Sequence, residues 1–183
     1  MTQLSLTIPP PLPGTRDEAC LEAFQGDLDY VHRALRRLGA APSEMDDLTQ
    51  DVFVALRRAW HNYDPGRPIR PYLFGIAFRI ASTHQRKRRR EMSLGPADPV
   101  DLGPNPHELL QSKQARAVVL AALEQIALPR RAVLVMFDLD DVPMTEVAAA
   151  LEIPLFTAYS RLRKARRELE RVVRRLLREV DEK

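Results

Sequence analysis

A proline-rich segment near the middle of the chain limits the possible folds more than any other feature. Residues 92–110 contain four prolines and two glycines, so neither a helix nor a strand is expected to persist there. The same segment holds three acidic residues and no Lys or Arg. We therefore expect a flexible, acidic, proline-rich linker over residues 92–112, which divides the chain into two small domains, residues 15–91 and 113–183.

Both domains are predicted to be helical. In the first, apolar residues recur every three or four positions at Met45, Leu48, Val52, Leu56 and Trp60, as on the buried stripe of one helix. A proline, a serine suited to capping and several acidic residues just before or within its first turn mark the start of this helix.

Further signals complete an all-α interpretation. A helix over residues 28–38 is expected to stop at Gly39, and Pro71 suits the first position of another helix. Residues 1–14 end in Pro-Pro-Pro-Leu-Pro-Gly and are expected to be a disordered lead. The predicted fold is a helical bundle, the linker, and a second helical domain that contains a helix-turn-helix.

Composition excludes several classes of protein. The chain carries 28 Lys and Arg against 25 Asp and Glu, and its one cysteine, Cys20, allows neither a disulfide framework nor a thiolate metal site. The four histidines lack metal-ligand spacing, and there is no Gly-rich phosphate loop or nucleophile elbow. No secretory signal or membrane-length apolar run is seen. We expect a cytoplasmic protein without enzymatic activity, cofactor, metal or membrane insertion.

One acidic cluster has two interpretations. Asp138, Asp140 and Asp141 lie close together in the sequence, and carboxylates bind divalent ions. They lack the spacing of a calcium loop, so a turn between two helices is the simpler interpretation.

Positive charge is concentrated in two runs. Residues 159–178 hold nine Arg or Lys against two Glu, and residues 86–90 read Arg-Lys-Arg-Arg-Arg. These runs favour two separate contacts with a polyanion such as nucleic acid, although solvated helix faces would give the same pattern.

The run at residues 159–178 begins within the predicted helix-turn-helix over residues 146–167. Its second helix could lie in a DNA major groove, where Arg reads guanine, Ser, Thr and Lys hold phosphates, and an aromatic ring contacts a thymine methyl. An ordinary surface helix with arginines is the alternative. The candidate DNA-reading residues are Phe156, Thr157, Tyr159, Ser160, Arg163, Lys164 and Arg167.

The run at residues 86–90 follows a segment in which aromatic and basic residues are interleaved. Single-stranded nucleic acid is bound by rings that stack on unpaired bases and by cations that follow the backbone. The rings could instead be core, as we expect in part for Trp60, whereas Tyr63 and Tyr72 are expected to be better exposed. The candidates are Tyr63, Arg70, Tyr72, Arg79, Thr83, Arg86 and Lys87.

A third surface is expected opposite the apolar stripe of residues 45–60. Hydrogen-bonding groups there surround one apolar side chain, which suits a protein partner, though a solvated face is equally consistent. The residues are Asp47, Gln50, Asp51, Val54 and Arg57.

These segments together resemble a known family. DDLTQDVFVALRRAW at 46–60 and RPYLFGIAFRIA at 70–81 are similar to region 2 of the bacterial extracytoplasmic-function sigma factors. Residues 123–169 resemble region 4 of the same family, in the right order and after a linker. Tyr72, Pro143 and Glu152 stand where the family commonly has Trp, a capping serine and glycine.

The resemblance implies a role for each surface. The face around Asp51 would dock on the β′ clamp helices of the RNA polymerase core, which also includes the β subunit. The segment from Tyr63 to Lys87 would melt and read the minus-10 promoter element, and the helix from Leu155 to Arg167 would read the minus-35 element. The family often uses an anti-sigma factor, so a partner of this kind is expected as well.

Two other functions remain open at this point. A free-standing helix-turn-helix regulator would bind duplex DNA alone, and an RNA-binding adaptor would use the 86–90 run. A sigma factor alone is expected to bind duplex promoter poorly and to gain affinity with core polymerase, so gel shifts distinguish the three.

Overall fold

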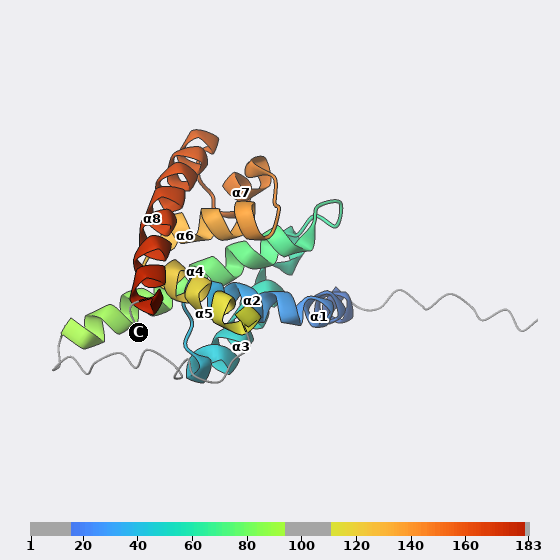
Figure 1. Cartoon of the computed structure of the whole chain (residues 1–183). Coiled ribbons are helices and arrows are strands. Elements are labelled where there is room, and N and C mark those ends of the chain that lie inside the picture. The colour runs from blue at the N-terminus through green and yellow to red at the C-terminus, as the bar shows by residue number, and fades with distance from the viewer. Residues whose placement is uncertain (1–15, 94–110, 182–183) are drawn as a thin grey trace, which may run out of the picture.

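The computed structural model describes residues 16–93 and 111–181, and within them it contains helices and turns but no strand (Figure 1). The helices are α1 (Arg16–Gly26), α2 (Leu28–Leu38), α3 (Met45–Ala59), α4 (Ile69–Ser93), α5 (Gln111–Glu124), α6 (Leu128–Leu134), α7 (Met144–Ala150) and α8 (Leu155–Asp181), with short 3-10 turns η1 (Pro42–Glu44) and η2 (Trp60–Asn62) and a π-helical turn η4 (Val135–Leu139). None of the described helices has both the length and the apolar character needed to cross a bilayer. The N-terminal lead and residues 94–110 of the expected linker lie outside the described residues, so the domain limits stay predictions.

The first bundle, α1–α4, is organised around α4, which contacts both α2 and α3. Helix α2 stops at Gly39, as expected, and the φ of 95° at this residue is a left-handed conformation that glycine adopts without strain. The predicted stripe of α3 lies in the core, where Leu48, Val52 and Leu56 are at most 3% exposed. This packing fixes α3 through its apolar side and leaves its opposite side at the surface.

Two helix starts in this bundle differ from the expectation. Ser43 makes no capping hydrogen bond; instead the Glu44 carboxylate accepts one from the Ala41 amide at 3.0 Å. Helix α4 begins at Ile69 rather than at Pro71. A proline at the third helical position is still within the first turn, where a backbone N–H has no intrahelical partner, so it does not interrupt the helix.

The second bundle, α5–α8, contains the predicted helix-turn-helix in α7 and α8. Helices α5, α6 and α7 all contact α8, whose buried side includes Ala158, Leu162 and Ala165. The turn between α7 and α8 places Glu152 at a φ of 53°. A left-handed conformation costs an L-residue about 1–2 kcal/mol, which explains why glycine would suit this position better.

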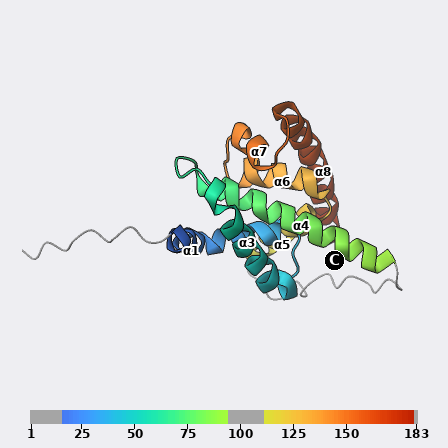
Figure 2. The same ribbon diagram turned by 180° about the vertical axis from the view of Figure 1, so that it is seen from behind.

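The two bundles lie against each other and share one hydrophobic core. Buried residues of both belong to a single cluster, and helix α4 contacts α7 while α2 contacts α5 and α6. Figures 1 and 2 show α4 running between α3 on one side and α7 on the other. The backbones approach tightly at Gly75 of α4, where an added Cβ would overlap the carbonyl oxygen of Ala150.

Candidate nucleic-acid and protein interfaces

The polar side of α3 is open to solvent. The five residues expected to bind a protein partner are all exposed: Asp47, Gln50, Asp51, Val54 and Arg57. Val54 is 38% exposed in the middle of this face, and Arg57 also pairs with Asp17 of α1 at 3.0 Å. Because α3 lies on the side of α4 away from α7, the second bundle does not cover this face (Figure 2).

Three aromatic rings form a block at the start of α4. The rings of Trp60 and Tyr63 stack with centroids 4.9 Å apart, and the Tyr63 ring lies 5.2 Å from that of Tyr72. The Tyr63 hydroxyl donates to the Arg67 carbonyl oxygen at 2.7 Å, and the Tyr72 hydroxyl donates to that of Ala59 at 3.2 Å. Burial raises the pKa of both tyrosines above the ordinary value. The two tyrosines are half-buried, and therefore more enclosed than the sequence led us to expect.

Two predicted cations of this region have partners within the chain. Arg70 donates through Nε to Asp27 Oδ1 at 2.7 Å and lies 5.6 Å from the centroid of the Tyr30 ring. This hydrogen bond to Asp27, and the carboxylate charge, raise the pKa of the Arg70 guanidinium. Arg79 donates through Nη1 to Glu152 Oε1 at 2.9 Å, so a residue of the first bundle reaches the turn of the helix-turn-helix.

The remaining candidates of α4 follow on the next two turns. The Thr83 hydroxyl donates to the Arg79 carbonyl oxygen at 3.0 Å, and Arg86 donates through Nε to that of Ser82 at 3.2 Å. Both side chains are exposed, as is Lys87. Since α4 continues through the basic run, these charges are carried on a helix that is anchored in the core at its other end.

The start of α8 presents the second predicted reading surface. Phe156 and Tyr159 are 76% and 54% exposed, so neither ring serves the core. Arg163, Lys164 and Arg167 are also exposed. Thr157 and Ser160 are half-buried on the flank of the same helix. The seven residues therefore share one helix surface that faces away from the core.

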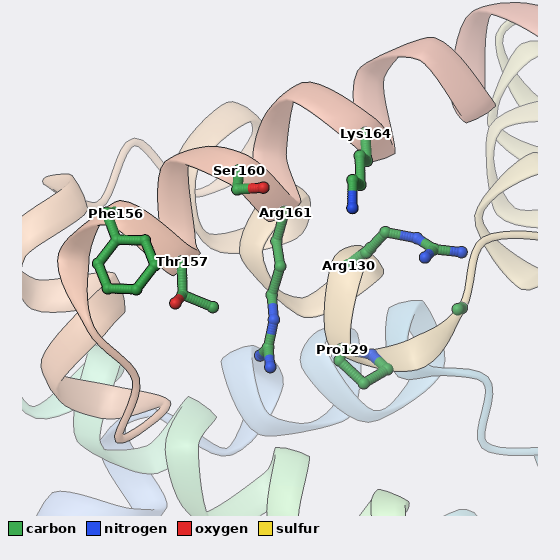
Figure 3. Close-up of a pocket in the computed structure, with 8 residues that line it drawn as sticks. Pro129, Arg130, Phe156, Thr157, Ser160, Arg161 and Lys164 are labelled. Carbon is green, nitrogen blue, oxygen red and sulfur yellow. The ribbon is translucent and has the colours of Figure 1, made fainter.

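An open cleft of about 340 Å³ separates this part of α8 from the start of α6 (Figure 3). Arg161 and Lys164 extend from α8 into it, and Arg130 reaches it from α6. Arg130 pairs through Nε with Glu168 at 3.0 Å, whereas no carboxylate among the described residues pairs with Arg161 or Lys164. The half-buried Thr157 and Ser160 add two hydroxyl groups to the wall of the cleft. Its chemistry is therefore that of an anion-binding site.

Arg130 and Arg161 are not among the residues predicted from the sequence. Nothing in the sequence separates them from the other arginines, because only the packing of α6 against α8 brings them to one cleft. The same is true of Arg131, which is 3% exposed and donates to the carbonyl oxygens of Glu124 and Ile126 near the end of α5. Burial lowers the pKa of this guanidinium to about 10, so Arg131 is charged at neutral pH.

The acidic turn before α7 is occupied by ion pairs. Asp138 accepts two hydrogen bonds from Arg166, at 2.6 and 3.0 Å, which hold α8 to η4. Asp140 crosses to the first bundle, where it accepts hydrogen bonds from the Tyr30 hydroxyl at 3.1 Å and from Arg37. Within the described ranges, no group of acidic, His or Cys residues is placed to hold a metal ion. These pairings agree with the interpretation of the cluster as a turn.

Two family models match the chain. Residues 23–91 match sigma-70 region 2, and residues 112–169 match sigma-70 region 4. Together the two matches cover more than half of the chain, and they contain all three candidate surfaces.

Several curated proteins are similar over most of this chain. The ECF RNA polymerase sigma factor SigE of Mycolicibacterium smegmatis is 29% identical over 164 residues, which are 85% of this chain and 63% of SigE. The chain thus spans less than two thirds of the length of that relative. The RNA polymerase sigma factor CnrH of Cupriavidus metallidurans is 27% identical over 147 residues, which are 75% of this chain and 77% of CnrH.

Two solved structures have a similar fold. One is CnrH in complex with the cytosolic domain of CnrY, with a TM-score of 0.61, 24% identity and coverage of 85% of this chain and 88% of that one. The other is the sigma factor RpoE from Bartonella quintana in complex with the anti-sigma factor NepR, with a TM-score of 0.64, 21% identity and coverage of 84% and 98%. With regions 2 and 4 matched in order, and ECF factors among its relatives, the chain belongs to the extracytoplasmic-function group of the sigma-70 family.

Proposed function

We propose that this chain is a promoter-specificity subunit, which directs transcription initiation by bacterial RNA polymerase. The observation that carries the proposal is the presence of three chemically distinct surfaces on one chain. An exposed mixed face on α3 suits a protein, aromatic and basic residues around α4 suit unpaired DNA, and the start of α8 suits a duplex. A role in initiation is supported by both family matches.

The face of α3 would hold the polymerase core through the β′ clamp helices, with the β subunit as a further contact. Asp47, Asp51 and Arg57 supply charge, and Val54 supplies an apolar contact at the centre of the face. A central apolar side chain within a polar rim is the usual anatomy of a protein interface.

The start of α8 would read the minus-35 element in the major groove. Arg163 and Arg167 can reach base edges, and the rings of Phe156 and Tyr159 can contact thymine methyl groups. The cleft beside them would take a backbone phosphate, because Arg161 and Lys164 place positive charge there without a carboxylate partner. Base contacts and one phosphate contact would then fix the register of the helix.

The segment from Tyr63 to Lys87 would capture the minus-10 element as unpaired DNA. Flipped bases would stack on the aromatic rings, while the basic side chains of α4 would contact the DNA backbone. Extracting a base from the stack costs a few kcal/mol, which capture of the flipped base would offset. The chain would itself catalyse no chemical step and would act in the cytoplasm, where an anti-sigma factor would be an additional partner.

A comparison of DNA binding with and without polymerase tests this proposal. The chain alone should bind duplex promoter DNA poorly. After core polymerase is added, the complex should bind this DNA with high affinity and with sequence preference. Strong, sequence-specific binding of duplex DNA by the chain alone would instead indicate a free-standing regulator. A preference for RNA over both forms of DNA would indicate an RNA-binding adaptor.

A further inference from the structure

We propose that the start of α8 reads the C5 methyl group of a pyrimidine, so that its duplex site accepts 5-methylcytosine where it accepts thymine. The ligand is one apolar methyl group at the edge of a base pair in the major groove, and Phe156 and Tyr159 contact it. This inference rests on the proposed function, because it assumes that the helix lies in that groove. It adds that methylation of a cytosine in the element changes the affinity for the promoter.

The two rings contribute little to the fold. Phe156 is 76% exposed and Tyr159 is 54% exposed, whereas Ala158 between them is fully buried. Among the described residues, no other aromatic ring and no guanidinium stacks on either of them. Exposure of large apolar side chains to water costs free energy, which a ligand that covers them recovers. The two rings are therefore free to contact a ligand.

The rings and an arginine follow one line along α8. Residues three, four and seven positions apart lie on the same side of a helix, so Phe156, Tyr159 and Arg163 share one face. The rings lie in the first turns of α8, and the N-terminal part of a reading helix is the part that contacts base edges. Arg163 follows Tyr159 by about 6 Å of helix rise, or about two base-pair steps. A guanine read by Arg163 should thus lie within about three base pairs of the methylated pyrimidine.

A paired base offers an aromatic side chain one apolar group in the major groove. The faces of paired bases are covered by their neighbours, so the rings cannot stack on them as they would on unpaired bases. The groove edges of guanine, adenine and cytosine carry hydrogen-bonding groups, whereas thymine adds its C5 methyl group. 5-Methylcytosine presents the same methyl group at the same ring position. A surface that reads this group therefore binds both bases and discriminates against uracil and cytosine.

The neighbouring cleft fixes the distance of the first ring from the DNA backbone. Phe156 lines the cleft between α6 and α8 together with Arg161 and Lys164 (Figure 3). A backbone phosphate bound by these two cations would lie next to the ring. The ring would then be held near one base pair and could not slide along the groove. The effect of the methyl group should therefore depend on its position within the element.

The charge around the rings favours DNA over a protein as their ligand. Arg163, Lys164 and Arg167 are exposed on the same part of α8, and no carboxylate among the described residues pairs with them. A cluster of cations attracts a polyanion such as duplex DNA, whereas an apolar protein surface would leave these charges without a partner. Rings and cations together therefore suit the groove of a duplex.

The test uses the full chain bound to core polymerase and a library of promoter duplexes. Selection of the bound duplexes identifies the preferred minus-35 element and its thymines. At each thymine position, four otherwise identical duplexes are compared, with thymine or uracil opposite adenine and with 5-methylcytosine or cytosine opposite guanine. Within each pair of duplexes only the methyl group differs. At one or two positions we expect about three- to five-fold tighter binding of the methylated member of both pairs.

Two variants show whether the rings cause this preference. Phe156→Ala and Tyr159→Ala each remove one exposed ring and leave the buried side of α8 unchanged, so the fold should persist. The advantage of the methylated duplex should disappear at the position that the missing ring contacts. Val119→Ala removes exposed apolar surface from α5 of the same bundle and is the matched control, which should keep the full preference.

Three results would overturn the inference. The selected element could contain no thymine on either strand, the methyl group could leave the affinity unchanged in one or both pairs of duplexes, or the preference could persist in both ring variants. Weaker binding of the ring variants to core polymerase without DNA would also overturn it, because the rings would then contact a protein. Failure of the proposed function would look different, since the complex of chain and polymerase would select no minus-35 element from the library.

Discussion

The guanidinium of Arg79 is paired with the carboxylate of Glu152 at 2.9 Å, although the two residues belong to different bundles. Arg79 is a candidate contact for the minus-10 strand, and Glu152 forms the turn of the helix-turn-helix expected to read the minus-35 element. The pair therefore joins two candidate DNA-binding surfaces where α4 and α7 pack together.

Reversal of one charge on α3 should abolish binding to core polymerase. Asp51→Arg places a cation on the solvent-exposed face of α3, so the fold should be unaffected. We expect at least a ten-fold loss in affinity for core polymerase in a pull-down titration, or about 1.4 kcal/mol. Glu170→Arg, on the exposed side of α8, is the control. Wild-type affinity for Asp51→Arg would show that α3 does not dock on polymerase.

Two arginines of α8 should differ in what they read. Arg163→Ala should cost about 1–3 kcal/mol on the preferred minus-35 sequence and relax the preference at one position. Arg161→Ala should weaken binding to all duplexes alike and should reduce the salt dependence by about one phosphate contact. Both are measured by footprinting of the polymerase complex at several salt concentrations. If Arg161→Ala changes sequence preference but leaves the salt slope unchanged, the α6–α8 cleft is not a phosphate site.

Much of the fold and of the candidate surfaces could be predicted from the sequence because their signals are local. The spacing of Leu48, Val52 and Leu56 fixes which side of α3 is buried, and therefore which side is open. Gly39 marks the end of α2 by its conformational freedom alone. The predicted helix-turn-helix is confirmed with its turn at Glu152.

The contacts between bundles could not be predicted in this way. The pairs Arg67–Glu146 and Arg79–Glu152 join residues that are 79 and 73 positions apart in the sequence. The spacing of apolar residues predicts which side of a helix is buried, but it does not predict contacts between such distant residues. In the sequence, Arg131 cannot be distinguished from the other arginines of this basic protein. Only the structure shows that it is buried and donates hydrogen bonds to carbonyl oxygens at the end of α5. The enclosure of Tyr63 likewise depends on which rings meet, which the order of residues does not determine.

Loss of the buried guanidinium should destabilise the second bundle. Arg131→Met would leave the carbonyl oxygens of Glu124 and Ile126 without their donor, at a cost of about 2–3 kcal/mol in the free energy of unfolding. Because the pKa of Arg131 is about 10, this contribution should be constant between pH 6 and 9. Urea denaturation measures it, with half-buried Arg130→Met as the control. Equal stability of the two variants would contradict the capping role of Arg131.

Glycine at the turn should separate backbone strain from the ion pair. Glu152→Gly relieves a left-handed conformation and should raise the free energy of unfolding by about 0.5–1 kcal/mol, although the pair with Arg79 is lost. Glu152→Gln loses the ionic interaction and keeps the strain, so it should not stabilise the chain. Thermal and urea unfolding compare the two variants. An identical effect of both substitutions would show that the φ of 53° stores no strain.

The central claim is that this chain gives core polymerase its choice of promoter, and in vitro transcription from a randomised promoter library tests it most directly. We expect the chain to direct core polymerase to a restricted set of start sites, each preceded by a shared pair of upstream elements, and we expect Asp51→Arg to abolish these transcripts. A transcript pattern identical to that of core polymerase alone, with the chain present in excess, would contradict the account.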